Sequence, residues 1–406
     1  MRNHPTILLL IIPIFVFAQQ NELTYYNLAR TALADGDTLQ YRDYLLQANQ
    51  LSHQFPEITY ELAQAYSMNK QHHEAWKLLH ALAKGGMGFP VTQNAVFQPF
   101  LQDKKWKKVT RKMEMNAKPI LRSSVFYQFT DTALIPEGIA YDASREYFYI
   151  GSIHQQKIIR FRPHEKPQDI YQGLPPLGMK VHSTLPILYA CVNDKKGQEY
   201  RSGLLRINLI TNYIDTIFID NIGQHLFNDL DYDIHGNAYI TDSEAGAIYY
   251  YDVNKNEIAH TFSSPELVYP NGIVWLKAAQ VLIVATVRGL AHIDLVNKNI
   301  TTMTLLDNGF AHGIDGLYWS GNELIGVQNS GVPDRILKIR LNNNYQQILN
   351  IKVLEAAHSL YDSPTTGVIS QNYFYYIANS CIGKYVRAHD TPNGCKAPVI
   401  LRSKLH

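Results

Sequence analysis

Four side chains that carry an oxygen occupy the same place in a short phrase that recurs along the chain. Each precedes glycine or aspartate, as Glu137-Gly138, Asn228-Asp229, Asn271-Gly272 and Asp315-Gly316. Carboxylate and amide oxygens are the hard donors that calcium prefers, and no cysteine accompanies them, which disfavours zinc. Two carboxylates that face one another in a poorly hydrated space repel, and a divalent cation relieves that repulsion. If the four side chains converge, the pattern predicts a calcium site, with another divalent cation as the alternative.

The spacing of the phrase indicates the fold that would bring these side chains together. Its Gly or Asp positions are 138, 178, 229, 272, 316 and 367, which lie 40, 51, 43, 44 and 51 residues apart. A four-stranded blade of a β-propeller uses roughly 40 to 50 residues, so the chain is predicted to be mainly β, with a six-bladed β-propeller. The innermost strand of each blade runs along the central channel, so equivalent residues converge near one end. Asn-Gly and Asp-Gly are also ordinary turn formers, but that explains one or two copies and not Glu137.

A run of β-branched or aromatic residues follows each phrase and predicts the second strand of a blade. These runs are 147–150, 187–190, 238–241, 281–284, 323–326 and 373–376. The segment Val125 to Thr130 precedes the first blade. We expect it to supply an outer strand to the last blade and so to close the ring.

The part of the chain before the propeller is predicted to be helical and self-similar. Leu28-Ala29 recurs as Leu62-Ala63, at a separation of 34 residues, which is the tetratricopeptide period. Gly36-Asp37 and Lys70-Gln71 are the expected turns within the two helical pairs. We therefore divide the chain into a signal peptide (1–18), a tetratricopeptide-like helical domain (19–115) and the propeller (116–406). The helices either offer a groove to a protein partner or only brace the propeller.

The first residues resemble an export signal. Arg2 is followed by an apolar run from Ile7 to Phe17, and Ala18 provides the small residue before a cleavage site. The run is too short for a stable membrane span, although a retained signal anchor is the alternative. The prediction is a secreted or periplasmic protein that begins at Gln19. Export permits disulfides, so Cys381 and Cys395 either close a loop in the last blade, leaving Cys191 free, or all three cysteines stay unpaired.

The charge balance excludes one class of partner. The 406 residues carry a formal net charge of +2 with both signs mixed along the chain, and no long stripe of Lys or Arg. A nucleic-acid partner is therefore not expected.

The four phrases resemble those of a known family over roughly residues 120 to 390. The surroundings of Glu137, Asn271 and Asp315 look like the metal-binding blade starts of the senescence marker protein/regucalcin/gluconolactonase family. With Asn228 added, the set resembles those of diisopropylfluorophosphatase and paraoxonase. The resemblance implies a catalytic calcium, metal-assisted hydrolysis of a small lactone or ester, and a role for Asp315 in activating water.

This chain departs from those relatives at two places. Leu226 stands where gluconolactonase-like members carry an arginine that holds the sugar acid, and Leu177 stands where paraoxonases carry a histidine. Three histidines near blade starts are alternative bases, each more readily explained as structural: His225, His312 and His358. Arg288 and Asn329 follow second strands and are weaker candidates for the channel.

Two functions of different class remain. The first is a secreted calcium-dependent hydrolase of a lactone or related ester. The second is a non-catalytic, calcium-stabilised propeller that binds a ligand or a protein. The intact set of four oxygen donors favours the hydrolase, and the missing arginine and histidine favour the binding protein.

Overall fold

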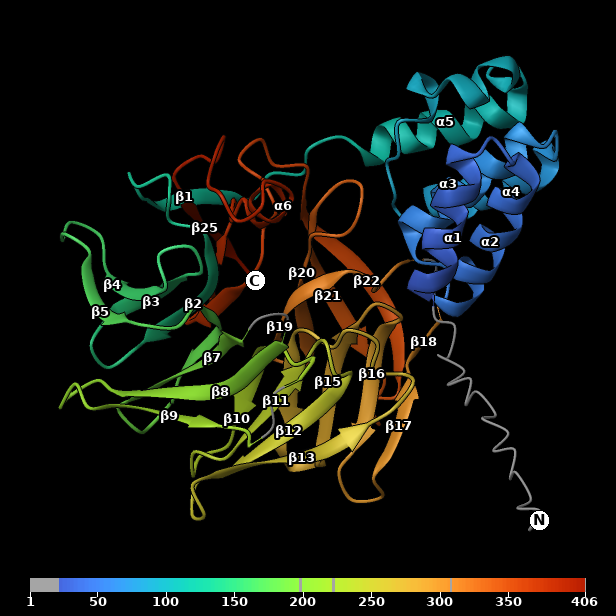
Figure 1. The fold of residues 1–406 in the computed structure, drawn as a ribbon. Coiled ribbons are helices and arrows are strands. Elements are labelled where there is room, and N and C mark those ends of the chain that lie inside the picture. Colours follow the sequence, from blue (N-terminus) through green and yellow to red (C-terminus); the bar gives the residue numbers. More distant parts are fainter. Residues whose placement is uncertain (1–21, 197–198, 221–222, 307–308, 406) are drawn as a thin grey trace, which may run out of the picture.

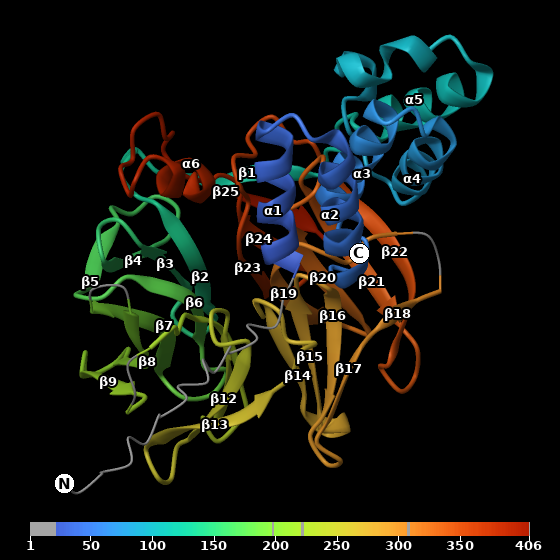
Figure 2. The same cartoon turned by 45° about the vertical axis from the view of Figure 1, so that its right-hand side comes forward.

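The computed structural model describes residues 22–196, 199–220, 223–306 and 309–405. Within these residues the strands form six separate sheets, and the first strands of the sheets contact one another in a closed ring. Figures 1 and 2 show the sheets side by side, with the helices beyond one edge of them. The predicted six-bladed β-propeller is confirmed.

The blades follow one another along the chain, and each predicted second strand lies in the second strand of a blade. The first blade contains β2 (Pro136–Asp142), β3 (Tyr147–Ser152), β4 (Lys157–Phe161) and β5 (Gln168–Gln172). The second contains β6 (Pro176–Val181), β7 (Ile187–Lys196), β8 (Glu199–Asn208) and β9 (Ile214–Phe218). The third contains β10 (Phe227–Tyr232), β11 (Ala238–Asp242), β12 (Ala247–Asp252) and β13 (Glu257–Ser263).

The remaining three blades have the same plan. The fourth contains β14 (Ile273–Leu276), β15 (Val281–Thr286), β16 (Gly289–Asp294) and β17 (Asn299–Thr302). The fifth contains β19 (Ile314–Ser320), β20 (Glu323–Gln328), β21 (Arg335–Leu341) and β22 (Gln347–Ala356), with the short β18 (Thr304–Leu305) parallel to β22. The sixth contains β23 (Gly367–Ser370), β24 (Tyr373–Ile377), β25 (Val399–Lys404) and β1 (Ser123–Gln128).

The ring is closed by the first strand of the chain. β1 pairs antiparallel with β25, from Ser123 opposite Ser403 to Gln128 opposite Val399. The outer strand of the last blade therefore comes from before the first blade, as predicted, although it starts two residues earlier than the expected segment. This pairing satisfies the edge of β25 within the protein, so the last blade presents no unpaired third strand.

Close approach of neighbouring first strands explains the glycine in the recurring phrase. A Cβ atom on Gly138 would lie 2.1 Å from the carbonyl oxygen of Leu177 in the next blade. A Cβ atom on Gly272 would lie 2.4 Å from the carbonyl oxygen of Asp315. Real side chains do not fit at such distances, so the crowded axis of the ring requires glycine at these two positions.

Helices precede the propeller. They are α1 (Glu22–Ala34), α2 (Thr38–Leu51), α3 (Pro56–Met68), α4 (His72–Lys84) and α5 (Lys104–Asn116), with the 3-10 helices η1 (Val91–Gln93) and η2 (Ala95–Phe100) before α5. α3 begins thirty-four residues after α1, and α4 thirty-four residues after α2. The turns fall where predicted, with φ of +78° at Gly36 and +61° at Lys70. Helical pairs at this period are thus confirmed, whereas membership of the tetratricopeptide family stays a prediction.

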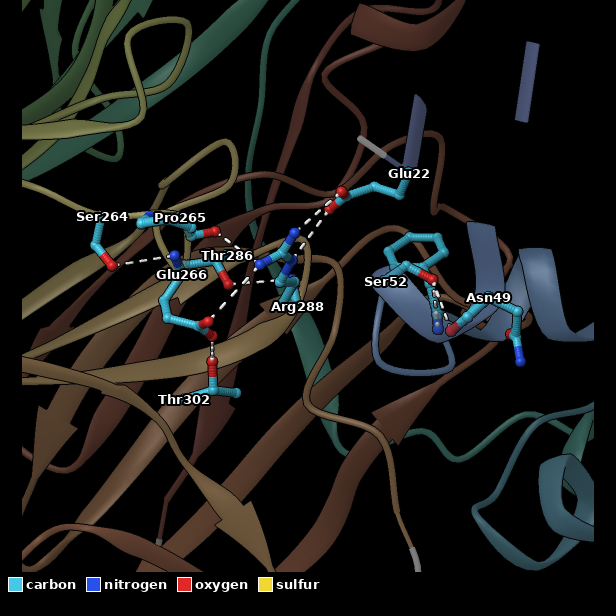
Figure 3. A network of polar contacts seen from close by, with 10 residues as sticks. Glu22, Asn49, Ser52, Ser264, Pro265, Glu266, Thr286, Arg288 and Thr302 are labelled. Atoms are coloured by element: carbon cyan, nitrogen blue, oxygen red, sulfur yellow. Dashed lines mark hydrogen bonds and ion pairs between the residues drawn. The ribbon is translucent and has the colours of Figure 1, made fainter. Parts of the chain in front are cut away.

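The helices pack against the loops of the fourth and fifth blades. Phe310, which lies between these blades, is buried in the apolar cluster of the helices. The Gly88 N–H donates to the carbonyl oxygen of Val332 over 2.6 Å. Arg288, in the loop between β15 and β16, forms an ion pair with Glu22 of α1 at 3.2 Å (Figure 3). These contacts support the bracing role, and a groove for a protein partner stays a prediction.

The helices and the predicted ligands share one end of the propeller. The first strand of each blade begins at this end. Because the strands of a blade are antiparallel, the second strand runs back to the same end, and the loop between the second and third strands lies there too. The loops that the helices contact are of these two kinds. A further helix, α6 (Ile382–Arg387), replaces the corresponding loop of the sixth blade, between β24 and β25.

A disulfide ties down this last insertion. Cys381 and Cys395 are joined, and Cys191 is free and buried, so the first of the two cysteine predictions is confirmed. The residues of the predicted signal peptide, 1–18, lie outside the described residues. Among the helices that are described, none has the length and apolar character needed to cross a membrane.

Candidate metal centre

The four predicted ligands line a single cavity of about 580 Å³ at the mouth of the central channel. Glu137, Asn228 and Asp315 lie in the first strands of blades one, three and five, and Asn271 lies just before the first strand of blade four. The convergence expected from the repeat is therefore present. Their role as ligands stays a prediction.

A β-bulge at the start of the first strand turns three of these side chains, Glu137, Asn228 and Asp315, toward the channel. The register with the second strand shifts between Pro136 and Ile139, and again between Ile314 and Leu317. The same shift recurs in blades two and three. Bulges leave residues out of the strand ladder and re-aim their side chains. Because the bulge contains the position before the Gly or Asp, Glu137 and Asp315 leave the plane of their sheets.

Hydrogen bonds with residues that directly follow the second strands orient two of the predicted ligands. Asn329, after β20, donates its amide Nδ2 to Asp315 Oδ2 over 2.7 Å. Asn228 donates its Nδ2 to Ser243 Oγ over 2.9 Å, and the Ser243 hydroxyl donates in turn to the carbonyl oxygen of Pro270 over 2.7 Å. The donor group of Asn228 is thus occupied by Ser243, which leaves its oxygen as the atom that can serve a cation.

Burial and nearby negative charge disfavour the ionised forms of both carboxylates. Burial, and then the charge of Asp315, raise the pKa of Glu137 well above its usual value, although a hydrogen bond from Thr365 acts in the opposite direction. Burial raises the pKa of Asp315 to about 6, against hydrogen bonds from Asn329 and Asn271. Both side chains keep some exposure to the cavity but are deeply surrounded by protein. A cation bound between them would stabilise the ionised form of both carboxylates.

A third carboxylate lies beyond them. Asp229 takes the place of the glycine in the third blade, and it is buried with its Oδ2 atom free of hydrogen-bond partners among the described residues. Burial raises its pKa, while the buried Lys180 lowers it. Asp229 also contributes to the raised pKa of Asp315. Asp229 is thus a third acidic group near the predicted ligands, with the cation of Lys180 beside it.

The composition of the site fits calcium and does not fit zinc. The described residues contain no cluster of three or more His, Cys, Asp or Glu placed for a metal ion. Cation binding at this cavity would therefore depend on the amide oxygens of Asn228 and Asn271 beside the two carboxylates. An all-oxygen set of this kind, completed by water, is the usual environment of calcium.

The weaker candidates, apart from Asn329, lie elsewhere. None of the described residues that line the cavity is a histidine. His225 contacts the Asp242 carboxylate at 2.7 Å, and His358 accepts a hydrogen bond from the Leu360 N–H. His312 contacts the carbonyl oxygen of His53, and burial lowers its pKa to about 4. Arg288 pairs with the helices. The three histidines and Arg288 thus make structural contacts away from the cavity, in agreement with the structural explanation favoured from the sequence.

Other residues complete the cavity wall, and most of them carry no signal in the sequence. Leu177 and Leu226, the two departures from the related proteins, do line the cavity. So do Tyr385, from α6 and its disulfide loop, and Asp194, from the extended β7. The pair of cysteines fourteen residues apart was the signal for an insertion at this place. No local pattern marked Ser243.

Comparison with known proteins shows the fold. No family model matches the chain, and no curated protein matches it. The chain is similar to a solved gluconolactonase from Xanthomonas campestris, with 10% sequence identity over 70% of this chain and 95% of that chain, and a TM-score of 0.50. A glucose dehydrogenase-type oxidoreductase from Thermus thermophilus has 13% identity over 70% and 99%, with a TM-score of 0.48. A luciferin-regenerating enzyme has 12% identity over 71% and 95%, with a TM-score of 0.47. At 10% identity, the likeness to the gluconolactonase shows the propeller fold and nothing about the reaction.

Proposed function

We propose that this protein is a calcium-dependent hydrolase of an uncharged lactone or related ester, with the cation held by Glu137, Asn228, Asn271 and Asp315. The observation that carries the proposal is the charge of the cavity. The described residues that line it include four carboxylates, Glu137, Asp194, Asp315 and Asp390, and no Lys, Arg or His. Such a cavity attracts a divalent cation and repels an anionic substrate.

The residues present assign roles to the parts of the site. A bound calcium ion would polarise the carbonyl oxygen of the ester, which lowers the cost of the charge that develops there during attack. Asp315 is the candidate base that takes a proton from the attacking water, because its carboxylate lines the cavity and is held there by the amide of Asn329. Asn329 and Asn271 hold that carboxylate in a fixed orientation. Leu177 and Leu226 make the wall apolar where related proteins place charged or polar groups.

The gluconolactonase likeness agrees with a lactone but does not select one. The leucine at position 226 removes the arginine expected for a sugar acid, so we expect neutral and less polar lactones or aryl esters to be the better substrates. No further cofactor is required by this chemistry.

Hydrolysis measured with calcium added or chelated tests the proposal. We expect turnover of some members of a panel of aliphatic lactones, sugar lactones and aryl esters, lost on chelation and reduced at least about a hundredfold in Asp315→Asn. Asp169→Asn, which changes an exposed carboxylate beside Lys157, is the control and should keep full activity. Absence of turnover across the panel with calcium saturating would contradict the proposal.

One observation favours the second candidate, a non-catalytic propeller that calcium stabilises and that binds a ligand. Among the described residues that line the cavity, none is the histidine or the arginine that the related proteins use, so the proposed cation site lacks these companions. Calcium binding in the complete absence of turnover would select this function. A protein partner at the helical repeats would belong with it.

We also propose that the protein is secreted or periplasmic. The predicted signal peptide, residues 1–18, and the disulfide between Cys381 and Cys395 support this location, because disulfides persist in oxidising compartments. Mass spectrometry of the protein recovered from its native compartment should find Gln19 as the first residue. A cytosolic protein that retains Met1 would contradict the proposal.

A further inference from the structure

A second and larger cavity lies beside the candidate metal centre. It has a volume of about 930 Å³ and lies between the helices and the loops of the third and fourth blades. Its wall includes Leu23 of α1, Phe55 and Ile58 near the start of α3, and Val268 of the propeller. Concave apolar surfaces of this size are typical of sites for small organic ligands. One wall of this cavity is therefore formed by the helices that precede the propeller, and the other by the propeller itself.

The two cavities share a boundary. Tyr269 lines both of them, and it comes two residues before the predicted ligand Asn271. Ser243 lines the second cavity and at the same time accepts the hydrogen bond from Asn228 in the first. A molecule that extends from the metal centre past Tyr269 would thus enter the second cavity without crossing the protein core.

The backbone holds Tyr269 at this boundary in an unusual conformation. Its φ is +50°, in the left-handed region that bulky residues rarely adopt, and the next residue is Pro270. Conformations of this kind persist where the surrounding structure requires them, and they gather at ligand sites. The conformation sets the side chain between the two cavities.

An ion pair closes one side of the second cavity. Arg288 and Glu22 both line it, and their side chains are 13% and 6% exposed. Figure 3 shows Arg288 between Glu22 and the carbonyl oxygen of Pro265, to which its Nη1 donates over 2.7 Å. Because the only described Arg or Lys of this cavity is committed to these partners, the cavity offers no unpaired positive charge to an anionic ligand.

Large apolar side chains in this cavity are exposed to water. Leu23 is 61% exposed and Tyr269 is 43% exposed, although both face a concave wall. Burial raises the pKa of Glu57, which also lines the cavity, to about 7, so near neutral pH its carboxyl group is protonated in about half of the molecules. A flexible, uncharged aliphatic chain would cover these surfaces and displace water from them.

We propose that the second cavity binds the aliphatic chain of the substrate, whose lactone or ester group lies at the metal centre. The substrate class is then a neutral lactone or ester with a long alkyl or acyl chain. This inference rests on the proposed function for the reaction, but the binding of the chain is measurable without turnover. The helical region acts, in this view, as one wall of the substrate site as well as a brace.

Chain-length dependence of hydrolysis tests the proposal. With γ-lactones that bear methyl, hexyl or nonyl substituents, kcat/KM of the full-length protein should rise by roughly fourfold per added CH₂ group until the chain fills the cavity. Leu23→Asp should lower kcat/KM for the nonyl lactone by more than about tenfold and leave the methyl lactone unchanged. The matched control is Leu39→Asp, because Leu39 of α2 is 57% exposed and does not line the cavity. It should change neither rate.

A binding measurement separates this inference from the proposed reaction. The neutral apolar fluorophore N-phenylnaphthylamine should bind the wild type and be displaced by decanol but not by the same concentration of butanol. Leu23→Asp and Val268→Asp should both weaken this binding by about tenfold or more, and Leu39→Asp should not. If no lactone is hydrolysed but the decanol effect depends on Leu23, the reaction is wrong and the chain site stands. If lactones are hydrolysed without dependence on chain length, or if probe binding is the same in all variants, the chain site is refuted.

Discussion

Removal of calcium should reverse the effect of Asp315→Asn on stability. Burial raises the pKa of Asp315 from 3.8 to about 6, so without a cation its ionised form costs the folded protein about 3 kcal/mol near pH 8. The folded pKa exceeds the unfolded one, so this cost grows as the pH rises from about 4 to 6 and persists above that range. Asparagine removes the charge but loses one of the hydrogen bonds from Asn271 and Asn329, which is worth about 1 kcal/mol. In chelator, the variant should therefore be more stable than wild type by about 2 kcal/mol.

With calcium bound, the wild type should become more stable than Asp315→Asn. Calcium at about a hundred times its Kd adds about 2.7 kcal/mol to the wild type, because only the folded state presents the site, and adds much less to the variant. Thermal unfolding of both proteins near pH 8, in chelator and in calcium, measures the effect, with roughly 2 °C expected for each kcal/mol. Asp169→Asn is the control and should have no effect in either condition, since Asp169 forms an exposed ion pair. A variant that is less stable than wild type in both conditions would refute the reasoning.

Two further predictions concern groups around the site and the helices. Burial raises the pKa of both Glu57 and Asp334 to about 7, so the free energy of unfolding should fall by up to about 6 kcal/mol, about 3 kcal/mol for each group, as the pH rises from about 4 to 7. Glu57→Gln should make this dependence shallower in pH-dependent melting, and an unchanged slope would contradict the assignment. Ser243→Ala removes the partner that orients Asn228, so calorimetry should find calcium bound about tenfold more weakly, with little change in melting temperature in chelator. Equal calcium affinities would show that Ser243 does not position the ligand.

The sequence by itself determined the propeller and the members of the candidate site. Repetition carries this information, because residues at one place in a repeat occupy one place in each blade. Glu137, Asn228, Asn271 and Asp315 were recognised as a set for that reason, and the structure places all four at one cavity. The thirty-four-residue period likewise located the helical pairs. The sequence also predicted that the ring is closed by β1, because one strand segment precedes the first blade and has no place in it.

The tertiary structure alone decided which groups surround that set. Arg288 follows a second strand, as Asn329 does, yet it pairs with Glu22, which lies 266 residues earlier, whereas Asn329 contacts Asp315. The pairing of Cys381 with Cys395 was one of two predictions from the sequence until the insertion was seen to fold back over the cavity. The docking of the helices depends on complementary shape between segments far apart in the chain. A periodic pattern reports what each repeat shares, and it holds no information about contacts that occur only once.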